Sequence, residues 1–116
     1  MMNGTHAILY STDAEADRAF LRDVLGLPNV DAGGGWLIFQ LPPAELGVHP
    51  TEGASTTELY LMCDDLDATL AGLAAKGVRP VGERVEARWG VRAYVALPSG
   101  ARLGLYEARH PVARDL

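Results

Sequence analysis

The sequence contains one cysteine, so the chain cannot form an internal disulfide. Cys63 stands in the apolar run LYLMC, where a buried structural thiol is expected rather than a nucleophile. Basic residues are also few: ten Lys and Arg against fifteen Asp and Glu give a net charge of -5. This balance argues against a nucleic-acid surface, which needs a basic patch. The thiol content favours a reducing, cytoplasmic location.

Long apolar runs are missing as well. No segment approaches the roughly 18 residues of a membrane helix, and the start MMNGTHAIL lacks a signal-peptide layout, so no membrane association is expected. No Ser/His/Asp triad, phosphate-binding loop or zinc-finger spacing is present. What remains is ordinary for a folded protein: 116 residues, 48% hydrophobic and 22% charged. We therefore expect a single domain over residues 1–116.

A strand that runs directly into a helix is predicted near the N-terminus. Residues 6–10, HAILY, suit a short strand with His6 on one face. Thr12 and Glu15 then have the spacing of a capping box, which satisfies free N–H groups where a helix starts. Apolar residues follow at helical spacing until Gly26, which suits a left-handed helix end.

Two further strands are predicted before the middle of the chain. The glycines 33–35 suit a flexible tip, because no helix follows them. Residues 36–41, WLIFQL, and 45–49, ELGVH, read as strands separated by a Pro-Pro turn. The polar stretch 51–57 suits a linker.

The second half repeats the first. Residues 58–63 form the next predicted strand, Asp64 and Asp65 cap a helix, and Gly77 ends it. Asp65 follows Glu58 by seven positions, as Asp13 follows His6, so the two units match at an offset of 52. This likeness predicts two modules, about 1–52 and 56–116.

Three strands are predicted after the second helix, at 79–86, 91–97 and 102–107, with a tight turn at 98–100. Each module then has one helix to cover one face of its sheet. The other face must be buried or curved around something, so we expect the functional site there.

Several stretches of the chain resemble the vicinal oxygen chelate superfamily, which includes glyoxalase I, bleomycin-resistance proteins and extradiol dioxygenases. They are HAILYSTDAEADRAFLRDVLGL, MCDDLDATLAGLAAKGV and the ending LPSGARLGLYEARHP, and the resemblance that rests on them covers essentially the whole chain. The resemblance implies an α+β fold in which two βαβββ modules form a cupped mixed sheet, a glyoxalase/bleomycin-resistance/dioxygenase-like fold that is usually completed in a homodimer.

The resemblance also implies where metal ligands would stand. His6 matches the first-strand ligand of one module, and Glu58 stands where the other module usually has His. Gly104 falls at the position of the family's last-strand Glu and cannot coordinate through a side chain. The fourth-strand ligand position is open between Glu45 and residue 47, with His49 on the same face. A metal set of His6, Glu45 and Glu58 suits Fe, Mn, Ni or Zn.

Three functions are compatible with this pattern. The first is a bleomycin-resistance-like protein that binds a small organic ligand in the cup with an incomplete family metal site. The alternative is a metal-dependent lyase, isomerase or dioxygenase in which His6, Glu45 and Glu58 bind the ion and Glu45 or Glu58 moves a proton. A third is a subunit whose sheet edges bind another protein.

For ligand binding, the residues of interest are the aromatic and charged side chains on the predicted strands and their turns. His110, in the tail, is expected to be solvated. The predicted ligand-binding set comprises Trp36, His49, Tyr60, Trp89, Arg92 and Tyr106, with Arg102 as a second arginine near the pocket.

Overall fold

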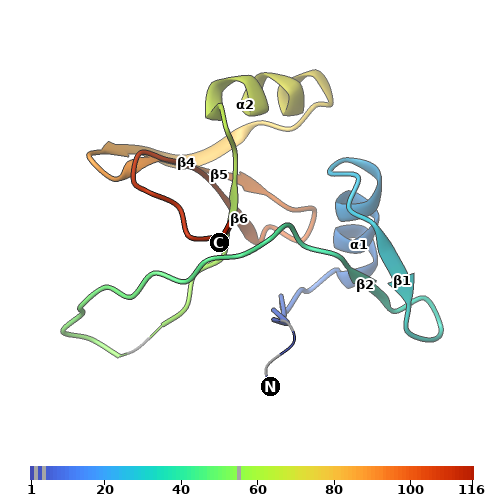
Figure 1. Ribbon diagram of the computed structural model, residues 1–116. Coiled ribbons are helices and arrows are strands. Elements are labelled where there is room, and N and C mark those ends of the chain that lie inside the picture. Colours follow the sequence, from blue (N-terminus) through green and yellow to red (C-terminus); the bar gives the residue numbers. More distant parts are fainter. Residues whose placement is uncertain (2, 4, 55) are drawn as a thin grey trace.

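The structure is a computed structural model that describes residues 1–116 except residues 2, 4 and 55. The second half of the chain forms the larger part of the fold. It is a four-stranded sheet in the order β3-β6-β5-β4 with α2 packed on one side (Figure 1). β3 pairs with β6 in parallel, and the other pairs are antiparallel. In chain order the elements are α1 (Ala14–Asp23), β1 (Asn29–Asp31), β2 (Leu37–Phe39), β3 (Tyr60–Met62), α2 (Leu66–Ala75), β4 (Pro80–Ala87), β5 (Gly90–Ala96) and β6 (Arg102–Ala108).

Helix α1 starts one residue later than the capping-box spacing predicted. Asp13, not Thr12, is the N-cap, and its carboxylate accepts a hydrogen bond of 3.2 Å from Ala16 N. Asp is among the best N-cap residues, so it takes this role from the neighbouring Thr. Gly26 has a φ of +66° and lies just past the helix, which confirms the predicted left-handed end.

Helix α2 is capped by Asp65, as predicted, with a bond of 3.0 Å from Ala68 N. A second carboxylate reaches the same helix end from the sheet: Glu107 Oε1 accepts a hydrogen bond of 2.8 Å from Leu66 N. Two of the free N–H groups of the first turn are thereby satisfied, and α2 is fixed against β6. The sequence did not indicate this role for Glu107.

The core lies between α2 and the α2-facing side of β5 and β6. Alternate residues of each strand point to this side, as the period of two requires. Val91 is 2% exposed and Val95 is completely buried. The buried apolar residues are Phe20, Leu66, Leu73, Val91, Ala93, Val95, Leu97, Leu103 and Leu105. Phe20 belongs to α1, so both helices contribute to this one core.

A buried carboxylate joins α1 to the far end of the sheet. Asp17 is only 3% exposed, and its two oxygens accept hydrogen bonds from Ser99 N at 2.9 Å and Ser99 Oγ at 2.7 Å. Burial by itself would raise the pKa of Asp17, but the hydrogen bonds from Ser99 and Ser11 outweigh it and lower that pKa. The predicted turn at 98–100 is confirmed by a bond of 2.8 Å from Gly100 N to Leu97 O.

Two of the predicted strands do not form. Residues 5–10 and 41–54 form no helix or strand and are largely exposed, and neither segment pairs with a neighbouring strand in the described part of the chain. The β1–β2 hairpin is the only ladder of the first half among the described residues, and β1 was not predicted. The Cα radius of gyration is 15.1 Å, above the roughly 13 Å expected for a compact domain of about 100 residues. The first half thus leaves two strand-like segments without a neighbour.

The α+β class is confirmed. The ends of the other five predicted strands each lie within two residues of the observed ends. The strand predicted at 36–41 is shorter, Leu37–Phe39, and the one predicted at 58–63 is Tyr60–Met62. Cys63 is half-buried against the core, in line with a structural thiol. None of the helices in the described part of the chain has the length and apolar character needed to cross a bilayer.

Candidate functional site: the tyrosine face

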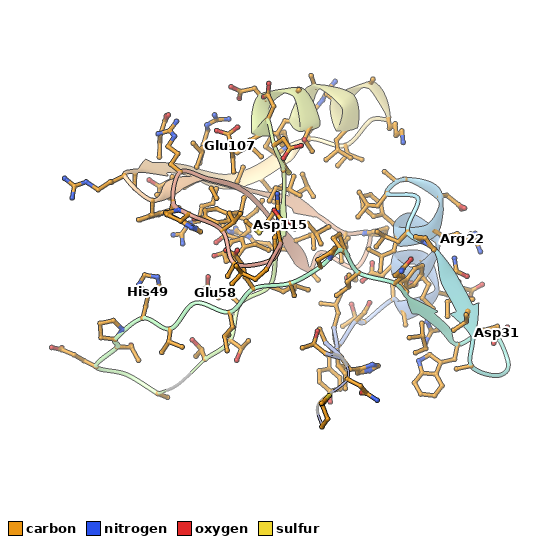
Figure 2. All side chains as sticks on the ribbon, viewed as in Figure 1. Arg22, Asp31, His49, Glu58, Glu107 and Asp115 are labelled. Atoms are coloured by element: carbon orange, nitrogen blue, oxygen red, sulfur yellow. The ribbon has the colours of Figure 1, made fainter. Side chains whose placement is uncertain are left out.

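The side of the four-stranded sheet opposite α2 carries polar and aromatic residues. We call it the tyrosine face and define it by Tyr60, Arg92, Tyr94, Gly104 and Tyr106. In the sheet register Tyr60 pairs with Gly104, Gly104 with Tyr94, and Arg92 with Tyr106. These side chains therefore meet although they come from three strands. Figure 2 shows Glu107 on the α2 side of the sheet and Glu58 on the other side.

The Tyr60 hydroxyl is the centre of a hydrogen-bond network. It donates to Glu58 Oε2, and it lies 3.0 Å from the Tyr94 hydroxyl and 3.4 Å from Arg92 Nη1. Burial raises the pKa of Tyr60 strongly, and the hydrogen bonds to Glu58 and Tyr94 raise it further. Tyr60 is therefore a protonated donor at neutral pH, not a tyrosinate.

Arg92 lies between this network and Trp89. Its guanidinium carbon is 5.7 Å from the centre of the Trp89 ring, which is a cation–π distance. Its Nε is buried and has no hydrogen-bond partner in the described part of the chain. Arg102 makes a similar contact with Tyr94, at 5.9 Å. The tyrosine face thus combines positive charge with aromatic rings.

The C-terminal tail folds back onto this face. The His110 ring stacks on Tyr106 at 5.7 Å between centroids, while 34% of its side chain stays exposed. Glu45 Oε1 accepts hydrogen bonds from Ala113 N at 2.8 Å and Arg114 N at 3.3 Å, and Glu45 Oε2 lies 3.9 Å from His110 Nε2. Burial and the nearby Glu45 charge raise the pKa of Tyr106. Glu45 is thereby placed beside the tyrosine face.

The predicted metal ligands do not assemble into one site. His6 lies in the exposed segment before α1, while Glu45 binds the tail and Glu58 binds Tyr60. Across residues 1, 3, 5–54 and 56–116, no three His, Cys, Asp or Glu side chains come together as metal ligands. This arrangement does not fit a metal ion, and ligation by His6, Glu45 and Glu58 stays a prediction for direct measurement.

The Tyr60 ring occupies the space beside Gly104. A Cβ at position 104 would lie 2.7 Å from Tyr60 Cε1, closer still to Cδ1, and 3.1 Å from Leu59 O. Real Cβ atoms do not approach other heavy atoms as closely as 2.7 Å. Gly104 is the position where the resemblance implies a metal-binding Glu, so here an aromatic ring takes the place of that carboxylate side chain.

Two of the predicted ligand-binding residues lie elsewhere. His49 is exposed on the long loop before β3, where Figure 2 shows it apart from the sheet. Trp36 is 54% exposed at the start of β2. A hollow of about 400 Å³ lies nearby on the hairpin, lined by Pro28, Asn29, Val30, Ile38, Phe39 and Gln40. It contains no charged side chain, and the tyrosine face offers much more specific chemistry.

In contrast, four of the predicted ligand-binding residues lie close together: Tyr60, Trp89, Arg92 and Tyr106. Trp89 and Tyr106 are 5.8 Å apart and Tyr60 and Tyr106 6.1 Å, measured between ring centroids. The predicted set left out Tyr94, although it stands two positions after Arg92 and must share its face.

Solved structures with this fold include proteins of several activities. A lactoylglutathione lyase from Agrobacterium tumefaciens is 21% identical, with 92% of this chain and 97% of that chain covered and a TM-score of 0.63. TnmS3, an antibiotic binding protein from Streptomyces sp. CB03234, is 26% identical, with 93% and 99% covered and a TM-score of 0.61. A glyoxalase family protein from Bacillus anthracis is 19% identical, with 93% and 99% covered and a TM-score of 0.58.

No family model matches the sequence. No curated protein matches it either. The similarity therefore lies in the arrangement of the elements, and it extends over more than nine-tenths of the chain. These neighbours confirm the resemblance in fold: the chain has the glyoxalase/bleomycin-resistance fold of the vicinal oxygen chelate superfamily.

Proposed function

We propose that the protein binds a small organic molecule on the tyrosine face and that this binding needs no metal ion. The observation that carries the proposal is the joined set of Glu58, Tyr60, Tyr94 and Arg92 on the sheet face opposite α2. Aromatic rings with a few converging polar groups are typical of small-molecule sites. The 26% identity to an antibiotic binding protein over nearly the whole chain supports the same interpretation.

The enzyme alternative has less support. Glu45 and Glu58, the two candidate proton carriers, are each held by hydrogen bonds to groups of the protein itself. The Tyr60 ring stands where the missing carboxylate would have to reach. A divalent ion with only one or two protein ligands is held weakly, because usable sites need three or four.

The binding proposal is tested by NMR, because the chain has only two tryptophans and each gives one indole N–H signal. The Trp36→Phe variant assigns the two signals. Addition of 2-naphthamide is expected to shift the Trp89 signal, whose ring borders the tyrosine face, and to leave the Trp36 signal in place. The proposal fails if Trp36 alone responds or if neither signal moves.

Elemental analysis of the purified protein tests the metal-free part separately. We expect less than about 0.1 divalent ion per chain, since the described side chains provide no three-ligand set. About one ion per chain, lost in the His6→Ala variant, would instead support the metal-dependent alternative.

We also propose that two modules, about 1–52 and 56–116, make up the domain and that a second copy of the chain covers the unpaired segments of the first. Ile8 is 64% exposed, Tyr10 88%, Leu46 86% and Val48 88%. Unpaired strand-like segments with exposed apolar residues are typical of surfaces that bind another chain. The homodimer implied by the fold resemblance makes a second copy the expected occupant.

Light scattering after size exclusion is expected to give twice the 12.4 kDa mass of one chain. Ile8→Asp combined with Val48→Asp should give a monomer, because buried unpaired carboxylates oppose association. Leu116→Asp is the control. Leu116 is a fully exposed terminal residue, so this substitution should leave the dimer intact. A monomeric wild-type protein at about 100 µM, well above the micromolar Kd of a weak complex, would contradict the proposal.

A further inference from the structure

The Arg92 guanidinium has an unusual set of neighbours for a shielded charge. One side of it is directed to the Tyr60 hydroxyl through Nη1, and its plane lies near the Trp89 ring. Nε, on the other side, is removed from water and makes no hydrogen bond in the described part of the chain. Most buried donors have a partner, so a donor without one requires an explanation.

No carboxylate of the described residues forms an ion pair with Arg92. The acidic residue closest to it in the network, Glu58, accepts a hydrogen bond from the Tyr60 hydroxyl and is linked to Arg92 through that hydroxyl. Tyr60 itself is a neutral phenol, because burial and its bonds to Glu58 and Tyr94 raise its pKa. The positive charge of Arg92 is thus left without a direct negative partner.

A guanidinium binds a carboxylate or another planar oxyanion through two parallel N–H bonds. Nε is covered by protein atoms, so the guanidinium offers its Nη groups to a ligand. The aromatic rings beside Arg92 lower the local dielectric, which strengthens such an interaction. Trp89 and Tyr106, 5.8 Å apart, lie next to the guanidinium and provide rings against which a flat ligand packs.

We infer that the ligand of the tyrosine face is an aromatic molecule that carries an oxyanion, a carboxylate or a group of like geometry, which binds the Arg92 guanidinium. This inference rests on the proposed function and adds the charge and shape of the ligand. Arg92 sets the preference for an anion, while Trp89 and Tyr106 contact the ring system.

The test compares two probes of nearly identical shape, 2-naphthoate and 2-naphthamide, by isothermal titration calorimetry at pH 7. The wild-type protein is expected to bind the naphthoate at least about tenfold more tightly, as one charge-assisted bidentate pair provides. In Arg92→Gln the two dissociation constants should become equal. Arg92→Lys keeps the positive charge but lacks the planar guanidinium, so it should retain only part of the preference for the naphthoate.

Arg84→Gln is the matched control, because Arg84 is paired with Asp67 on the α2 side at 2.8 Å. It should keep the wild-type ratio of the two dissociation constants. Equal affinities for both probes in the wild-type protein would overturn the inference and leave the proposed function standing. At a few millimolar even a complex with a dissociation constant of about 1 mM is populated. Failure of both probes to bind at that concentration would overturn the inference and the proposed function together. Should Arg92→Gln unfold, the wild-type ratio and Arg92→Lys still decide.

Discussion

Replacing Asp17 with Ala is expected to lower the free energy of unfolding by about 2–4 kcal/mol. The substitution removes both hydrogen bonds to Ser99 and leaves Ser99 N without its partner in a partly buried place. Hydrogen bonds to an ionised carboxylate are worth more than neutral ones, and an unsatisfied buried donor adds its own cost. Urea unfolding at pH 7, followed by circular dichroism, measures the change. Asp23→Ala is the control, because Asp23 pairs only with its exposed neighbour Arg22 at 2.7 Å among the described residues.

The pH dependence of stability provides the second arm of this experiment. The pKa of Asp17 is lower in the folded protein than its ordinary value of about 3.9, because Ser99 and Ser11 donate to the carboxylate more strongly than burial opposes its charge. Its contribution is therefore complete above about pH 3.9, the unfolded value, and is lost as the pH falls through the lower folded value. The gap in stability between wild type and Asp17→Ala should narrow in that acidic range. A gap that stays constant down to about pH 2, below the usual range of a carboxyl pKa, would contradict the assignment.

Gly104→Ala is expected to destabilise the protein by about 1–3 kcal/mol, although Ala is the smallest possible addition. The new methyl group would overlap the Tyr60 ring, which has to turn or move away and break its contacts with Glu58 and Tyr94. Overpacking of a close contact is what sets this cost.

A double-mutant cycle tests that explanation. In a Tyr60→Ala background the ring is gone, and Gly104→Ala should then cost less than about 0.5 kcal/mol, which gives a coupling energy of about 0.5 kcal/mol or more. Chemical unfolding of the four proteins measures it. Additive effects would show that the backbone at Leu59, not the ring, resists the methyl group.

The second half of the fold could be predicted from the sequence because its signals are local. Asp65 and Gly77 bracket α2, and the Ser99 turn separates two strands that pair directly with each other. The period of two along β5 explains why Arg92 and Tyr94 share the tyrosine face. Here each element carries its own start and end, and β4, β5 and β6 pair with strands that are close in sequence.

The first half could not be predicted in the same way. Residues 6–10 and 45–49 have the composition of strands, but a strand needs a neighbour, and composition does not say where that neighbour lies. Glu107 and Asp17 were missed for a related reason: each meets its partner across 41 and 82 positions of sequence, respectively. A carboxylate that reaches a distant N–H group leaves no periodic pattern behind.

His110 makes a contact that the sequence does not reveal. A polar residue in a short tail rich in charge is predicted to be solvated, and nothing nearby in sequence suggests an aromatic partner. Its ring, still partly exposed, stacks on Tyr106, because the tail turns back beyond β6 and its backbone N–H groups at residues 113 and 114 meet Glu45.

The contact between Tyr60 and Gly104 also constrains the history of the chain. An ancestor with an acidic side chain at 104 could not have held this tyrosine in its present place, and a descendant cannot recover the acid by one replacement. Residue 60 has to become small before residue 104 becomes large. Close relatives of this protein should therefore carry one bulky residue of the two, and sequences with both should be rare.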